Sequence, residues 1–227
     1  MLPTLVALPG LDGTGMLFKN LIAALGPRAK TIVVTYPPDQ ALGYTELETI
    51  ARGFLPSDEP YYLLAESFSG PIGISIAASA PPNLRGLILC CSFARNPLSW
   101  LAFARPLIRF APANPPIALL SHFVLGRFHM PAHRAALKDA LDRVSPHALR
   151  ARAKAALSVD VSTELEQIKT PVLYLRASED HIVPAACSAW IAALLPSARI
   201  EIIRGPHFLL QVASVEAAAA ILGLTGN

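Results

Sequence analysis

Short apolar runs recur along this chain and are separated by segments with helical character. Six of these runs predict β-strands, because they are apolar and stop at turn-forming or polar residues. The predicted strands cover residues 2–8, 30–36, 61–65, 84–91, 170–175 and 199–203. Helices are predicted over residues 16–25, 45–54, 69–80, 185–195 and 212–222. Thr45 is expected to cap the second of these helices, since Glu48 follows three residues later.

This alternation of strands and helices predicts an α/β fold. Strands that alternate with helices pair in parallel, through right-handed crossovers. The predicted strands are apolar on both faces, as a sheet covered by helices on both sides requires. We therefore expect one parallel sheet between two layers of helices.

The alternation stops between residues 94 and 160, a stretch that holds seven prolines and five aromatic residues. It predicts several short helices whose ends are set by proline. We expect residues 1–93 and 161–227 to form the sheet core and residues 94–160 to be a helical insertion. Ten basic residues stand against three acidic ones in this stretch, a local net charge of +7. This charge either attracts an anionic partner or belongs to a solvated helix face.

Composition narrows the class of protein further. The chain has 227 residues, enough for one large domain, and is 53% hydrophobic. No apolar run of about 18 residues lacks charges, so no transmembrane helix is predicted. The start of the chain has no signal-peptide pattern and the cysteine count is odd, which favours a cytoplasmic protein with reduced thiols. No cofactor or nucleic-acid partner is expected, nor a metal ion, because Pro131 separates His129 from His133 and no carboxylate is near them.

Three polar residues follow predicted strands in the order Ser67, Asp180, His207. A serine hydroxyl becomes a nucleophile only in an exposed position with a base within reach, and a sharp strand-to-helix turn supplies the exposure. Such a turn requires small residues two positions before and after the serine, and Ala65 and Ser69 meet this requirement. Ser69 is a weaker candidate because a proline follows it at the tight second position. The alternative role for Ser67 is that of a helix cap.

His207 is predicted to accept the serine proton and pass it to the leaving group, and Asp180 to orient the imidazole. His181 competes with His207, but it precedes the last predicted strand and needs an acid from elsewhere. Glu179 competes with Asp180, and Asp180 itself could serve only as a turn or cap residue.

Two backbone amides are predicted to stabilise an oxyanion. Phe68 N–H begins the helix after the serine, and Leu11 N–H lies in a loop with three glycines between residues 10 and 15. The same loop could be a turn without a ligand. A phosphate loop is disfavoured because no Gly-Lys-Ser/Thr ending follows.

These segments resemble the α/β-hydrolase family over nearly the whole chain. The resemblance rests on the nucleophile turn at residues 65–70, the acid segment at 178–184, the histidine segment at 205–208 and the loop at 8–11. Pro9 departs from the histidine that is common in the family's loop, and Ala65 and Ser69 stand where glycine is commoner. The resemblance implies an α/β-hydrolase fold. The chain opens on a strand that resembles the family's third strand, so we expect about six strands, all parallel, without the family's usual N-terminal antiparallel hairpin. The resemblance also implies that residues 94–160 form a lid.

The resemblance implies a serine hydrolase, and Ser67 argues against a dehalogenase or an epoxide hydrolase. Our leading hypothesis is a carboxylesterase that forms an acyl-enzyme on a small-molecule ester with an apolar portion. Its pocket is expected to be lined by aromatic residues of the lid, unless these form the lid's own core: Trp100, Phe103, Phe123 and Phe128. One alternative is a thioesterase or carrier-protein ester hydrolase that docks an acidic carrier on the basic lid. The other is a ligand-binding relative without catalytic function.

Overall fold

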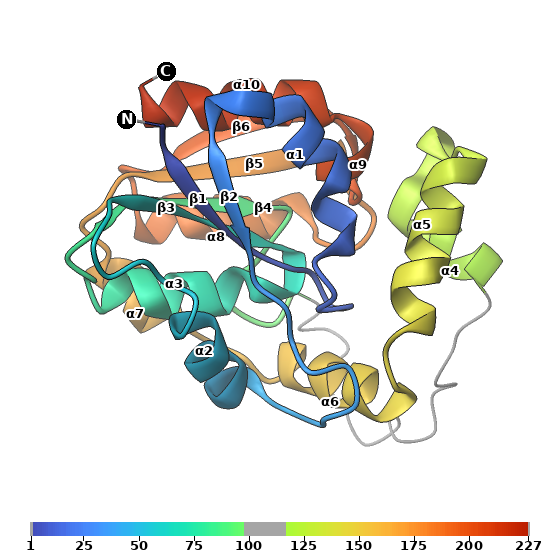
Figure 1. Ribbon diagram of the computed structural model, residues 1–227. Coiled ribbons are helices and arrows are strands. Elements are labelled where there is room, and N and C mark those ends of the chain that lie inside the picture. The colour runs from blue at the N-terminus through green and yellow to red at the C-terminus, as the bar shows by residue number, and fades with distance from the viewer. Residues whose placement is uncertain (1, 98–116, 227) are drawn as a thin grey trace.

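The computed structural model describes residues 2–97 and 117–226 and contains a six-stranded parallel sheet (Figure 1). The strands lie in the order β2-β1-β3-β4-β5-β6, and every neighbouring pair is parallel. This confirms the predicted α/β fold with about six parallel strands. The strands are β1 (Thr4–Leu8), β2 (Lys30–Val33), β3 (Tyr61–Glu66), β4 (Leu84–Cys90), β5 (Val172–Glu179) and β6 (Arg199–Pro206).

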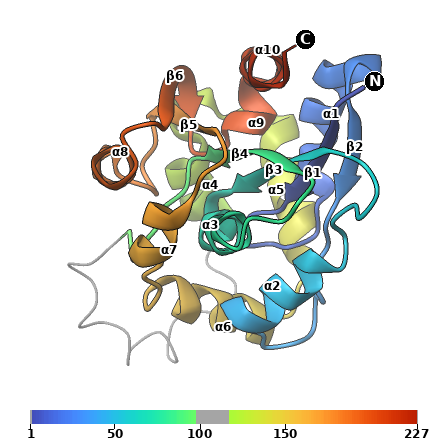
Figure 2. The ribbon, with the colours of Figure 1, turned by 90° about the vertical axis from the view of Figure 1, so that its left-hand side faces the viewer.

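Helices cover both faces of the sheet (Figures 1 and 2). One face carries α1 (Lys19–Leu25), α9 (Leu209–Val212) and α10 (Ser214–Thr225). The other carries α2 (Tyr44–Arg52), α3 (Gly70–Ala78), α7 (Ser162–Gln167) and α8 (Ala185–Leu194). Successive residues of a strand point to opposite faces, so Leu63 joins one apolar cluster and Leu64 the other. Burial on both faces is the reason that the strands are apolar throughout.

The start of α2 differs from the prediction. Gly43, not Thr45, is the N-cap residue, and the Glu46 carboxylate accepts a hydrogen bond of 3.0 Å from Gly43 N–H. Glu48 instead forms an ion pair of 2.7 Å with Arg52, four residues later on the same helix. A glutamate follows a possible cap residue by three positions twice, at Gly43 and Glu46 and again at Thr45 and Glu48. The helix begins at the earlier pair.

Residues 117–156 carry three further helices, which we call the helical segment: α4 (Ile117–Leu125), α5 (Pro131–Asp142) and α6 (Pro146–Ala156). Proline begins α5 and α6, as the sequence predicts, and Ser145 Oγ caps α6 by accepting from Ala148 N–H. In Figure 1, α4 and α5 stand beyond one end of the sheet. Their apolar residues pack with Phe208, which follows β6.

The two boundaries of the predicted insertion lie side by side. Arg95 and Asp160 form an antiparallel bridge, and Val161 N–H donates to Ala94 O over 2.8 Å. The division into a core and a lid remains a prediction. Within residues 2–97 and 117–226, no helix is both long enough and apolar enough to cross a membrane.

Candidate active site

Ser67 lies in a sharp turn directly after β3. It opens the 3₁₀ turn η3 (Ser67–Ser69), which leads into α3. Its φ angle of 50° lies in the left-handed region, where a residue with a Cβ pays about 1–3 kcal/mol in strain. The turn places Ser67 at the wall of a cavity at the end of the sheet.

Close packing beneath the turn explains which residues it tolerates. A Cβ on Gly70 would lie 1.7 Å from Ser92 Oγ, and one on Gly73 would lie 2.8 Å from the Cβ of Ala65. Ser92 Oγ donates a hydrogen bond to Ser67 O, which ties the end of β4 to the turn. Small residues are therefore needed on both sides of Ser67.

Ser67, His207 and Asp180 form one hydrogen-bonded chain. Ser67 Oγ lies 2.9 Å from His207 Nε2, and His207 Nδ1 lies 2.9 Å and 3.0 Å from the two carboxylate oxygens of Asp180. Each of the three directly follows a strand of the parallel sheet, β3, β6 or β5. Because the carboxyl ends of parallel strands meet at one edge, residues far apart in sequence come together there.

Asp180 is held in place from both sides. Its Oδ1 accepts hydrogen bonds of 2.8 Å from the backbone N–H groups of Ile182 and Val183, while the carboxylate faces His207. Burial by itself would raise the pKa of Asp180, but His207 and the two backbone donors outweigh it and hold the pKa below its ordinary value. Asp180 is therefore an ionised acceptor that fixes the imidazole ring.

The competing candidates lie elsewhere. Ser69 is fully buried, and its hydroxyl bonds with Tyr36 Oη at 2.8 Å and donates to Pro9 O. His181 lies beside Gly126, and Glu179 forms an ion pair with Arg127. The structure therefore joins neither competing acid nor competing histidine to Ser67.

Leu11 and Phe68, which carry the two predicted oxyanion donors, line the same cavity as Ser67. Phe68 N–H belongs to the first turn of η3, where backbone donors have no acceptor within the helix. Leu11 N–H donates no backbone hydrogen bond of the turns and loops to any described residue. Gly10 O, in the same peptide unit, accepts from Gly13 N–H at 3.0 Å. Since C=O and N–H of a trans peptide point in opposite directions, Leu11 N–H points out of the loop.

The cavity beside Ser67 has a volume of about 360 Å³ and a largely apolar wall. Its lining comes from the loops after the strands and from α4, α5 and α6. The apolar side chains from the helical segment are Leu120, Val124, Leu137, Leu141, Ala153 and Ala156, and Leu157, which directly follows the segment, also lines the cavity. The cavity thus lies between the sheet edge and the helical segment.

The aromatic residues predicted for the pocket are placed differently. Phe123 is 46% exposed and Phe128 packs against Arg127, and neither lines the cavity. α4 turns the aliphatic Leu120 and Val124, four residues apart, toward the cavity instead. Trp100 and Phe103 lie outside the described residues.

Comparison with known proteins decides the family. A model described as "Alpha/beta hydrolase family" matches residues 5–221, nearly the whole chain. The chain belongs to this family. The family assignment supports a hydrolase activity for this protein.

Relatives of this alpha/beta hydrolase include two curated proteins named "Putative carbamate hydrolase RutD". The one from Caulobacter sp. (strain K31) is 37% identical over 79 residues, which cover 34% of this chain and only 30% of that protein. The one from Serratia proteamaculans (strain 568) is 25% identical over 238 residues, which cover 90% of this chain and 84% of that protein. Among solved structures, the enol-lactonase from Burkholderia xenovorans LB400 has a TM-score of 0.84 at 14% identity, covering 100% of this chain and 92% of that one. This structural likeness shows the shared fold.

The sequence did not lead us to predict two buried carboxyl groups at the site of this alpha/beta hydrolase. Glu66 and Asp12 are each 6% exposed and line the cavity beside Ser67. Burial raises the pKa of Glu66 to about 7, and Asp12 adds to the effect, while the donor Gln211 opposes it. Gln211 Nε2 lies 2.9 Å from Glu66 Oε1. Glu66 could have been recognised from the sequence, because it is an acidic residue in an otherwise apolar strand and directly precedes the predicted nucleophile.

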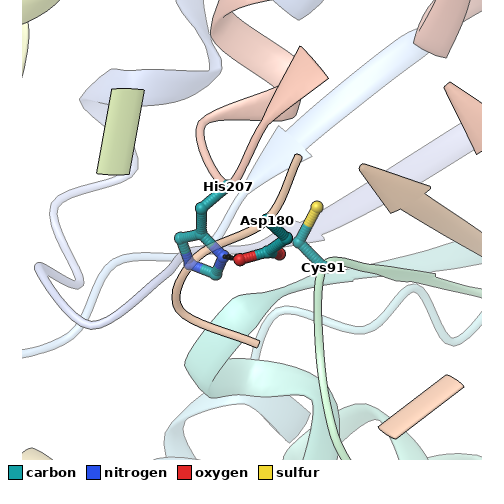
Figure 3. A group of neighbouring side chains, drawn as sticks. All are labelled: Cys91, Asp180 and His207. Carbon is teal, nitrogen blue, oxygen red and sulfur yellow. Dashed lines mark hydrogen bonds and ion pairs between the residues drawn. The ribbon is translucent and has the colours of Figure 1, made fainter. Parts of the chain in front are cut away.

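One group of three side chains among the described residues could contact a metal ion: Cys91, Asp180 and His207 (Figure 3). Their potential ligand atoms lie within 4.8 Å of one another. Burial raises the pKa of the Cys91 thiol well above its ordinary value, which disfavours the thiolate that a metal requires. A metal ion here would also compete for the atoms that join His207 to Asp180. The geometry therefore suits proton transfer better than metal binding.

Proposed function

We propose that this alpha/beta hydrolase cleaves carboxylic esters through an acyl-enzyme on Ser67. The observation that carries the proposal is the continuous hydrogen-bonded chain from Ser67 Oγ through His207 to Asp180. With Nδ1–H donating to Asp180, Nε2 of the neutral ring carries a lone pair directed at the serine hydroxyl.

The reaction follows from this arrangement. As Ser67 Oγ attacks the ester carbonyl carbon, its proton moves to His207 Nε2. The tetrahedral intermediate then collapses, the C–O bond to the alcohol breaks, and His207 returns the proton to the departing oxygen. Water repeats the sequence on the acyl-enzyme and releases the acid. Leu11 and Phe68 N–H are the donors that would stabilise the negative oxygen, each worth about 2.7–4 kcal/mol of barrier lowering.

The cavity points to the class of ester. Its volume of about 360 Å³ and its aliphatic wall suit an apolar acyl or alcohol group. The carboxyl groups of Asp12 and Glu66 lie at the cavity wall, and among the described lining residues there is no lysine or arginine to pair with an anionic group beside Ser67. The two relatives are named as carbamate hydrolases, and a carbamate that is a small anion would match neither property. We therefore favour neutral esters over small anionic carbamates.

The test is a panel of p-nitrophenyl esters of graded chain length, assayed with the wild type and with Ser67→Ala. We expect turnover by the wild type and a loss of about 10⁴-fold or more in Ser67→Ala. The matched control is Ser188→Ala, because Ser188 is also buried but its hydroxyl donates to Ala185 O within α8. A fluorophosphonate probe should label the wild type and the control but not Ser67→Ala. Equal turnover by Ser67→Ala would refute the proposal, and failure of the probe to label would favour a non-catalytic relative.

Thioesters and carrier-bound acyl substrates, added to this panel, test the alternative function. Three basic residues of the helical segment already form ion pairs: Arg127 with Glu179, Lys138 with Asp142 and Arg143 with Asp139. These ion pairs reduce the positive charge that the segment offers to an acidic carrier protein, which favours small-molecule esters. Faster turnover of carrier-bound thioesters, with strong salt dependence, would reverse this preference.

A further inference from the structure

Arg152, on α6, is the largest side chain that is fully buried among the described residues. Its guanidinium donates to three backbone carbonyls: Nη1 to Leu11 O at 3.0 Å and Asp12 O at 2.7 Å, and Nη2 to Pro37 O at 2.8 Å. A buried charge requires such compensation, and removal of the donors would leave three carbonyl groups without these partners. The contacts join the helical segment to the loops after β1 and β2.

The first of these loops carries Leu11 N–H. Gly13 N–H holds Gly10 O on one side of Leu11, and Arg152 holds the carbonyls of Leu11 and Asp12 on the other. The peptide unit that carries Leu11 N–H is thus held through Gly10 O, and the two peptide units that follow it are held by Arg152. Gly13 makes room for this arrangement, because its φ is +70° and a Cβ there would lie 2.5 Å from Arg152 Nη1.

We propose that Arg152 is a positioning residue for the oxyanion hole, which holds Leu11 N–H at the place where the substrate oxygen becomes negative. The inference rests on the proposed esterase function. Arg152 does not line the cavity, whereas its neighbour Ala153 does, so it acts through the loop and not on the substrate. Because Arg152 is on α6, the placement of the helical segment also sets the geometry of the hole.

This role has a specific kinetic signature. An oxyanion hole binds the transition state more strongly than the ester, so a misplaced Leu11 N–H lowers kcat and leaves KM nearly unchanged. Loss of one donor typically lowers kcat by about 10²–10³-fold. Partial displacement of the donor should lower it less, and we expect a fall of about 10- to 100-fold.

The experiment compares Arg152→Met and Arg152→Lys with Lys154→Met, an exposed control on the same helix. Arg152→Met keeps the apolar stem and removes the donors, so kcat should fall while KM changes by less than about twofold. Arg152→Lys keeps one donor group and should recover part of the loss, and Lys154→Met should match the wild type. An alkylboronic acid forms a tetrahedral adduct with the serine, so its inhibition constant should rise by the same factor as kcat falls.

Gly13→Ala provides a second perturbation if Arg152→Met fails to fold. The added Cβ of Gly13→Ala displaces the guanidinium of Arg152. Because both substitutions then disturb the same contact, the fall in kcat of the Gly13→Ala/Arg152→Lys double variant should differ from the combined falls of the two single variants. Wild-type kcat in Arg152→Met, or a change confined to KM with unaltered boronate inhibition, would overturn the inference. Additive effects of the pair would overturn it as well. Failure of the esterase proposal is distinguishable, because then Ser67→Ala would retain the activity of the wild type.

Discussion

Replacement of Glu66 by glutamine should change how stability depends on pH. Burial raises the pKa of Glu66 from 4.5 to about 7, so the folded protein holds this proton more tightly than the unfolded chain does. Since a tenfold change in proton affinity is worth about 1.4 kcal/mol, ionisation of Glu66 destabilises the fold by about 3 kcal/mol in total. The protonated carboxyl of Glu66 therefore stabilises the fold. Its contribution to the free energy of unfolding is fully present below pH 4.5 and is lost as the pH rises through about 7.

Glu66→Gln keeps the shape of the side chain and removes the titration. The replacement also offers an amide donor near Gln211 Oε1, a buried atom for which no hydrogen-bond partner is found among the described residues. The free energy of unfolding of the wild type should fall between pH 5 and pH 8, relative to that of Glu66→Gln, by about 2–3 kcal/mol.

Urea denaturation followed by circular dichroism at half-unit steps of pH measures this difference. Titrating groups that do not interact with Glu66 cancel in the comparison of the two proteins. Glu216→Gln, which removes an exposed carboxylate on α10, serves as the control and should run parallel to the wild type. Parallel curves for the wild type and Glu66→Gln would show that Glu66 stays ionised in the fold, and the reasoning from burial would be wrong.

Two further predictions concern packing around Ser67. Gly70→Ala should destabilise the protein by about 1–3 kcal/mol in urea denaturation, because its Cβ would lie 1.7 Å from Ser92 Oγ and 2.8 Å from Ser92 Cβ. The double variant Gly70→Ala/Ser92→Gly should recover part of this loss, and no recovery would mean that the contact is not the cause. Leu137→Phe narrows the cavity, so the ratio of kcat/KM for octanoyl over butyryl esters should fall about tenfold. An unchanged ratio would place the acyl group elsewhere.

The three residues of the hydrogen-bonded chain were predictable because each carries a local signal. Ser67, Asp180 and His207 all follow apolar runs, and parallel strands deliver their carboxyl ends to one edge. The small residues around Ser67 reflect the turn and also its packing, because a side chain on Gly70 would meet Ser92, which follows β4. The register of the sheet then brings the three side chains within hydrogen-bond distance.

The pocket and its supporting contacts were not predictable in the same way. The aromatic character of Phe123 gave no information on which face of α4 meets the cavity, and packing turned Leu120 and Val124 inward instead. Arg152 was one of ten basic residues in its stretch, yet its partner Asp12 O lies 140 positions away in the sequence. A contact over such a separation leaves no pattern in either segment.

By itself, the amino-acid sequence determined the order of strands and helices, the parallel sheet and the residues at its strand ends, because periodicity and turn chemistry act over a few neighbours. Only the tertiary structure decided which charged groups are buried and which helix faces line the cavity. Burial and the long-range hydrogen bonds of Glu66 and Arg152 arise when distant elements pack, and the same packing sets the pKa of Glu66 and the place of the Leu11 amide.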